Sequence, residues 1–249
     1  MTSLARVAGL RLVVAPILVV LALGALYVYL QVVPGRETDA IVLNWPYVTA
    51  RVVQHVEISG ISFGIAAVVG VPLGILLAQV GRALSWPVFA VANLGQAVPS
   101  VGILALGFSY IGLGIQGAII AITIYALLPI LRNTVVGLQA VDRDVQEAAR
   151  GMGMTPAQVL TRVKLPLASP VIFAGLRISL VLVIGTATLA NFIGGGGLGD
   201  LIAASDFFHP RPILVGAVLV SSLALLADWA LGIVERIVTP RTEDIRRTA

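Results

Sequence analysis

The sequence predicts an all-α protein, a polytopic bundle of about six membrane-spanning helices. Hydrophobic residues make up 58% of the chain and charged residues 11%, whereas soluble domains have roughly 45–50% and about 25%. Apolar stretches near the length of ~20 residues that a helix needs to cross a bilayer recur along the 249 residues. The basic residues flank these stretches instead of forming one face, which argues against a nucleic-acid-binding protein.

The apolar stretches give the expected order of the spans. The first, at residues 12–33, is longer than the ~7–15 apolar residues of a cleaved signal peptide, so we expect a retained span. A polar loop at residues 34–50 follows it. The later spans are expected at residues 52–80, 86–111, 115–137, 168–192 and 213–234, with a tight turn at 112–114, a polar segment at 142–166 and a glycine-rich loop at 193–212.

The distribution of arginine and lysine predicts how these spans are oriented. Six spans put both termini on one side. If that side is the cytoplasm, twelve basic residues lie inside and three, Arg36, Arg51 and Arg211, lie outside. Membrane proteins carry an excess of Lys and Arg in their cytoplasmic loops. We therefore expect the polar segment to be cytoplasmic and the glycine-rich loop to be external.

The polar segment has the local pattern of two short helices with a bend between them. Asp142 is a suitable N-cap for the first helix, and Gly153 can supply the backbone angles that a helix end needs. Thr155 begins the second helix as its N-cap, followed by a proline, and Gln158 completes a capping box. We expect this second helix to end near Leu165, because the next residue is a proline.

A longer pattern runs through the same segment. Glu-Ala-Ala is followed by three residues, a glycine, nine residues, a valine, one residue and Leu-Pro. This resembles the EAA loop of permease subunits of ATP-binding-cassette importers, with valine in place of isoleucine. The matching residues are Glu147, Ala148, Ala149, Gly153, Val163, Leu165 and Pro166. An ordinary helix–turn–helix is the alternative, and the number of positions fixed at the right offsets disfavours it.

The resemblance implies a MetI-like type I importer permease fold, in one transmembrane domain over residues 1–249. Residues 1–50 are then an N-terminal span and outer loop, residues 51–235 the core, and residues 236–249 a cytoplasmic tail. Two identical or similar permease subunits are expected to surround the path in a bacterial plasma membrane. Cytoplasmic ATPases that receive the EAA residues and an external substrate-binding protein complete the importer, so ATP is used by a partner and this chain binds no cofactor.

Three further stretches, residues 96–100, 125–134 and 184–199, are similar to permeases for glycine betaine, carnitine and choline. The resemblance then covers residues 50–235 and implies import of such osmoprotectants. Methionine importers carry related features and remain the alternative substrate class. The candidate path or gate residues are Gln96, Pro99, Asn133, Thr186, Gly196, Gly197 and Gly199.

The sequence offers no constellation for covalent or metal chemistry. There are no cysteines, and the two histidines are too few and too isolated for a metal site. Residues 60–64 spell the G-x-S-x-G of hydrolases, but inside an apolar helix, where small residues favour close packing. The glycine run at 194–199 lacks the Gly-Lys-Ser/Thr ending of a phosphate-binding loop. A channel, which needs no ATPase-docking segment, and an intramembrane enzyme are the remote alternatives.

Apart from Arg132, which is counted above on the cytoplasmic side, three charged residues fall inside the expected spans, where an unpaired charge is costly. Glu57 lies near the outer end of the second span and can reach the interface. Arg177 and Asp228 both lie in the cytoplasmic third of their spans. We expect these two side chains to form an intramembrane ion pair or to reach the interface, instead of forming a substrate site.

Overall fold

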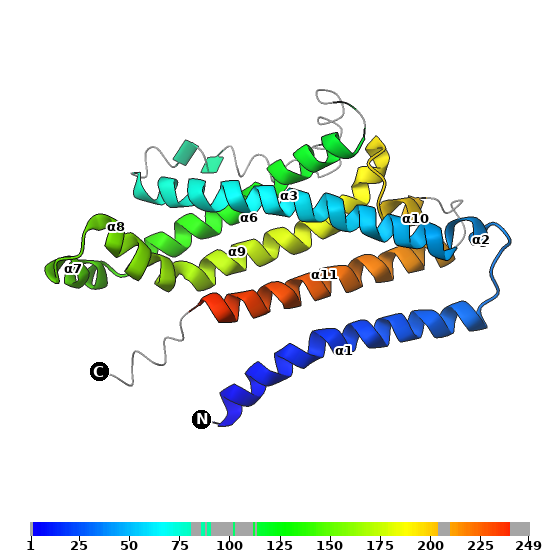
Figure 1. The fold of residues 1–249 in the computed structure, drawn as a ribbon, viewed down its shortest axis with the longest axis horizontal. Coiled ribbons are helices and arrows are strands. Elements are labelled where there is room, and N and C mark those ends of the chain that lie inside the picture. The colour runs from blue at the N-terminus through cyan, green and yellow to red at the C-terminus, as the bar shows by residue number, and fades with distance from the viewer. Residues whose placement is uncertain are drawn as a thin grey trace. The chain divides into compact units, whose positions relative to one another are not determined.

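Helices make up almost all of the described chain, and no strand occurs in it (Figure 1). The computed structural model describes residues 2–80, 86–87, 89–90, 102, 112, 114–203 and 210–239. By length and composition, five helical stretches in these ranges can cross a membrane: Val13–Val32, Trp45–Gln79, Ile115–Gln139, Pro156–Ile193 and Pro210–Val238. The predicted all-α membrane architecture is confirmed, and the span expected at 86–111 lies almost wholly outside the described residues.

The second span begins earlier than the sequence suggested. The N-terminal elements are α1 (Thr2–Val32), α2 (Asp39–Val42) and α3 (Trp45–Gln79). The polar loop expected at residues 34–50 is therefore wrong over most of its length. Its second half is helical because Asn44 acts as an N-cap, accepting a hydrogen bond from the Tyr47 backbone N–H at its Oδ1 (2.9 Å).

The helix after the capping box does not end at Pro166. After α6 (Ile115–Gln139) come α7 (Arg143–Gly151), α8 (Pro156–Gln158), a π-helical turn η1 (Val159–Lys164) and α9 (Leu165–Thr186). The predicted end near Leu165 is wrong, because the wider π-helical turn accommodates the proline. The Leu165 N–H donates to the Leu160 C=O, five residues back. This wider spacing leaves room for the proline ring, which would clash with the backbone in the four-residue spacing of an α-helix. The result is one continuous helical rod, Pro156–Ile193, that begins in the polar segment and continues into the span.

The glycine-rich loop is folded, not open. It follows a 3₁₀ turn, η2 (Ala187–Ile193), and leads into the short helix α10 (Gly199–Ala203) and then α11 (Pro210–Val238). Residues 195–199 are all buried. Gly194, Gly196 and Gly197 have φ of 74°, 74° and 84°, angles that side-chain-bearing residues rarely adopt. Within the loop expected at 193–212, the described residues 193–203 therefore form a tight, packed turn and a short helix.

The chain divides into two compact units. The first comprises Met1–Ile65, Val98–Ala126 and Leu180–Ala230, and the second Ala66–Ala97, Leu127–Ser179 and Leu231–Ala249. The core of the first unit gathers Leu26, Leu198, Leu201 and Val215. That of the second gathers Leu138, Val141, Ala168 and Ile172, with Leu160 and Leu165 packed against it. The second core therefore joins the polar segment at 142–166, from here on called the coupling segment, to the helices that flank it.

Candidate functional site

The EAA residues lie on α7 and on the rod that follows it. Asp142 caps α7, its Oδ1 accepting from the Asp144 backbone N–H (2.9 Å). The other end closes with Gly153 N–H to Arg150 C=O (2.9 Å) and Met154 N–H to Ala149 C=O (3.2 Å). This pair of bonds is the Schellman arrangement, and it requires Gly153 at φ 85°. The predicted N-cap and the predicted role of Gly153 in the bend are both confirmed.

The first three residues of the EAA pattern face in different directions. Ala149 is 2% exposed and anchors α7, whereas Glu147 and Ala148 are exposed. Within the part of the chain that the structure describes, the Glu147 carboxylate has no ion-pair or hydrogen-bond partner. A carboxylate and a methyl group are thus exposed at consecutive positions of a helix whose two ends are fixed.

The second half of the pattern belongs to the rod. Thr155 and Gln158 form the predicted capping box: Gln158 Oε1 accepts from Thr155 N–H (2.8 Å) and Thr155 Oγ1 from Gln158 N–H (3.3 Å). Val163, Leu165 and Pro166 are half-buried. Because Leu165 packs on the core of the second unit, the rod is held by apolar contact as well as by its cap.

Two adjacent polar residues of α3 hold the glycine loop in the first unit. Gln54 donates from Nε2 to Gly195 C=O (3.0 Å) and accepts at Oε1 from Gly197 N–H (3.0 Å). His55 is fully buried; its Nδ1 accepts from Leu198 N–H (3.3 Å) and its Nε2 lies 3.1 Å from Ile184 C=O. The tautomer with the proton on Nε2 satisfies both contacts.

A charged group extends this clamp. Arg51 Nε lies 3.0 Å from Asp200 Oδ2, in ion-pair contact but off the line of a hydrogen bond. Arg51 also donates to Gln54 Oε1 (2.7 Å) and covers the Tyr47 ring (4.8 Å), while Asp200 accepts from the Asn191 amide. The sequence patterns considered above did not predict this network. The available signal was three polar residues, Arg51, Gln54 and His55, near the start of an otherwise apolar helix, together with an acid directly after the glycines.

The candidate path residues fall in separate places. Thr186 ends α9, and Gly196, Gly197 and Gly199 belong to the clamped loop of the first unit. A side chain at Gly199 would overlap the Thr188 carbonyl, so a close approach requires that glycine. Asn133 belongs to the second unit, donates to Pro129 C=O (2.8 Å) and packs on Gly175. Gln96 and Pro99 lie outside the described residues, and the path role of all seven stays a prediction.

The intramembrane arginine has a partner that the sequence analysis did not consider. Arg177 Nη1 lies 3.4 Å from Glu235 Oε2, both within the second unit. Glu235 follows Asp228 by seven residues on α11, which places the two acids on the same helical face. The pair between Arg177 and Asp228 stays a prediction. No cluster of three or more possible metal-binding side chains occurs among the described residues.

Comparison with known proteins assigns the family. Residues 70–240 match the binding-protein-dependent transport system inner membrane component. The chain belongs to this family. It is 43% identical over 188 residues to the choline transport system permease protein OpuBB of Bacillus subtilis (strain 168), covering 75% of this chain and 86% of that protein. It is 46% identical over 191 residues to the carnitine transport permease protein OpuCB of Listeria monocytogenes, covering 76% and 86%.

A solved structure agrees with the fold of the family. A chain of the MetNI methionine ABC transporter, inward-facing, matches with a TM-score of 0.70 and 25% identity, over 80% of this chain and all of that one. The predicted importer-permease resemblance is confirmed. The chain is thus a membrane-spanning transporter component of a family that works with an ATPase and a substrate-binding partner.

Proposed function

We propose that residues 142–166 of this permease subunit seat in a separate cytoplasmic ATPase that drives import. One observation carries the proposal: Glu147 and Ala148 are exposed on a helix whose ends are fixed by Asp142 and Gly153. An exposed carboxylate on a helix with fixed ends can accept charge-assisted hydrogen bonds, and the neighbouring methyl group allows close approach.

The rod after the capping box transmits the movement of the ATPase. Helical structure is unbroken from Pro156 to Ile193, and only its first residues lie in the polar segment. A displacement imposed on α8 therefore reaches α9 without an intervening flexible joint. Closure of the ATPases on ATP then switches the path from inward-facing to outward-facing, a rigid-body transition. ATP is bound by the partner, and this chain binds no cofactor.

The assembly follows from the family and from the distribution of charge. Two permease subunits, identical or similar, surround the path in a bacterial plasma membrane, with both termini in the cytoplasm. An external binding protein delivers the substrate. Twelve of the sixteen Lys and Arg residues lie on the proposed cytoplasmic side, which supports this orientation.

The proposed substrates are osmoprotectants such as glycine betaine, carnitine and choline. Two relatives at 43% and 46% identity are named for transport of choline and of carnitine. The test is uptake of labelled glycine betaine, carnitine and choline into proteoliposomes that hold the complete complex. We expect ATP-dependent uptake in which these compounds compete with one another. Uptake of methionine alone would assign the chain to the methionine-type importers, and uptake without ATP would contradict an ATP-driven importer.

A further inference from the structure

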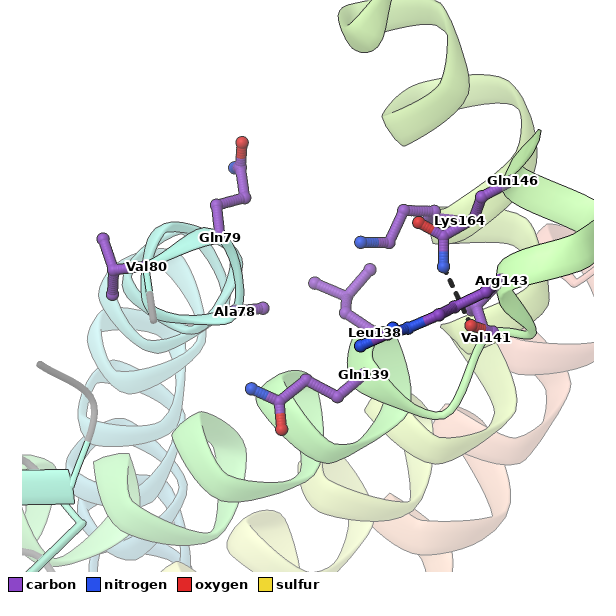
Figure 2. A pocket seen from close by; sticks show the side chains of 9 residues that line it. All are labelled: Ala78, Gln79, Val80, Leu138, Gln139, Val141, Arg143, Gln146 and Lys164. Atoms are coloured by element: carbon purple, nitrogen blue, oxygen red, sulfur yellow. Dashed lines mark hydrogen bonds between the residues drawn. The ribbon is translucent and has the colours of Figure 1, made fainter. Parts of the chain in front are cut away.

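A pocket of about 590 Å³ lies in the second unit, where the ends of α3 and α6 face the coupling segment (Figure 2). It is lined by Ala78, Gln79, Val80, Leu138, Gln139, Val141, Arg143, Gln146 and Lys164. A smaller hollow of about 290 Å³ shares four of these residues and adds Arg150. The two hollows together occupy the angle between the span ends and the two arms of the coupling segment.

The lining of the pocket is cationic. Figure 2 shows the Lys164 and Arg143 side chains extending toward the space beside Gln79 and Leu138. Three carboxamides line the pocket and no carboxylate does. Among the described residues, neither Arg143 nor Lys164 forms an ion pair or a side-chain hydrogen bond, and the same holds for Arg150. The pocket therefore holds positive charge without an internal counter-ion.

The position of the pocket indicates the kind of anion that fits it. Its floor is formed by apolar side chains at the ends of α3 and α6, two helices long and apolar enough to span a membrane. Ends of spans lie at the level of lipid headgroups, and basic pockets between them bind anionic headgroups. Arginine offers a planar fork of donors to phosphate and lysine a point charge.

We propose that this pocket binds a phosphate group carried by the headgroup of an anionic membrane lipid. Arg143 begins α7 and Lys164 ends η1, so one phosphate held by both joins the two arms of the coupling segment at the end of the spans. Lipid binding at this pocket does not depend on which substrate is transported, and it is separate from docking of an ATPase. Free phosphate offers the same chemistry as the headgroup, and the experiment distinguishes the two.

The test compares the purified chain in nanodiscs of phosphatidylcholine alone with nanodiscs that also hold phosphatidylglycerol, counting retained lipids by native mass spectrometry. We expect wild type to retain phosphatidylglycerol, and Arg143→Gln with Lys164→Gln to bind it about tenfold more weakly or worse, as the loss of charged hydrogen bonds implies. Arg162→Gln, an exposed cation outside the pocket, is the matched control and should bind as wild type does. Retention should fall as salt rises, because exposed charges are screened.

Two further arms decide the source of the phosphate and guard against misfolding. The charge-preserving double variant, Arg143→Lys with Lys164→Arg, should keep the lipid if the pocket acts through its charge. Inorganic phosphate that binds as tightly as the lipid and displaces it would overturn the lipid assignment in favour of a soluble anion. Equal retention by wild type and by the folded double glutamine variant would overturn the site itself.

Discussion

The Nδ1 atom of His55 accepts a hydrogen bond from the backbone N–H of Leu198, 143 positions later in the chain. Because that nitrogen must be unprotonated to accept, the ring proton sits on Nε2 and points at the Ile184 carbonyl. This neutral imidazole of α3 thereby fastens the glycine loop to α3 through one ring nitrogen, and α3 to α9 through the other. An isolated histidine in the sequence is thus a structural clamp, at a place where no metal cluster occurs among the described residues.

Removing this clamp should loosen the glycine loop. His55→Leu leaves the buried Leu198 N–H without an acceptor, and an unsatisfied buried donor costs about 1–3 kcal/mol. Gln54→Ala removes both hydrogen bonds to the loop, about 0.5–1.5 kcal/mol each. We expect both variants to unfold at lower temperature in detergent and to exchange the amide hydrogens of residues 195–198 faster. Val53→Ala, which truncates a neighbouring side chain that is 66% exposed, is the control, and equal protection in all three variants would refute the clamp.

The bend after α7 should depend on backbone angle alone. A Cβ at Gly153 meets no atom within 4 Å, so steric contact is excluded as a cause, but φ is 85° there. Gly153→Val should cost about 1–2 kcal/mol, and Gly153→Asn less, since asparagine tolerates this region better. Gly151→Ala, in open space within α7, should be neutral or slightly stabilising. Thermal unfolding measures all three, and equal effects of valine and asparagine would contradict the explanation.

Arg177 has two candidate acids, and a double-mutant cycle can distinguish them. Its contact with Glu235 joins two partly exposed side chains, for which coupling of about 0.2–1 kcal/mol is typical. We expect Arg177→Met to be non-additive with Glu235→Gln in thermal stability. Non-additivity with Asp228→Asn would support the pair predicted from the sequence. Simple additivity in both cycles would mean that neither acid is coupled to the arginine.

The orientation can be tested because the chain has no cysteine of its own. Glu37 is exposed in the loop before α2, and Met152 is 73% exposed after α7. We expect Glu37→Cys to react with a membrane-impermeant maleimide in intact cells, and Met152→Cys to react only after the membrane is permeabilised. Labelling of Met152→Cys in intact cells would place the coupling segment outside and overturn the topology.

The sequence predicted best where local chemistry decides the structure. The caps at Asp142 and Thr155 and the turn at Gly153 depend on neighbours within a few residues, and all three occur. The helix end predicted at Pro166 was wrong because a π-helical turn before the proline lets the helix continue. Local residue preferences do not predict such a change of helix type. The contacts of Gln54 and His55 join residues more than a hundred positions apart, and apolar periodicity carries no information about such pairing.

Docking of the ATPase through Glu147 can be tested by reversing one charge. The side chain is exposed on α7 and forms no ion pair or hydrogen bond with another described residue. Glu147→Lys should therefore leave folding intact and act at the interface. Glu37→Lys, the same charge change at an exposed residue before α2 and on the expected external side, is the matched control. The measurement is the amount of ATPase that co-purifies with each variant, together with substrate-stimulated ATP hydrolysis in proteoliposomes. We expect at least a tenfold loss of both for Glu147→Lys and little change for Glu37→Lys, as the loss of a charged contact at an interface implies; normal co-purification and normal stimulation in Glu147→Lys would contradict docking through this residue.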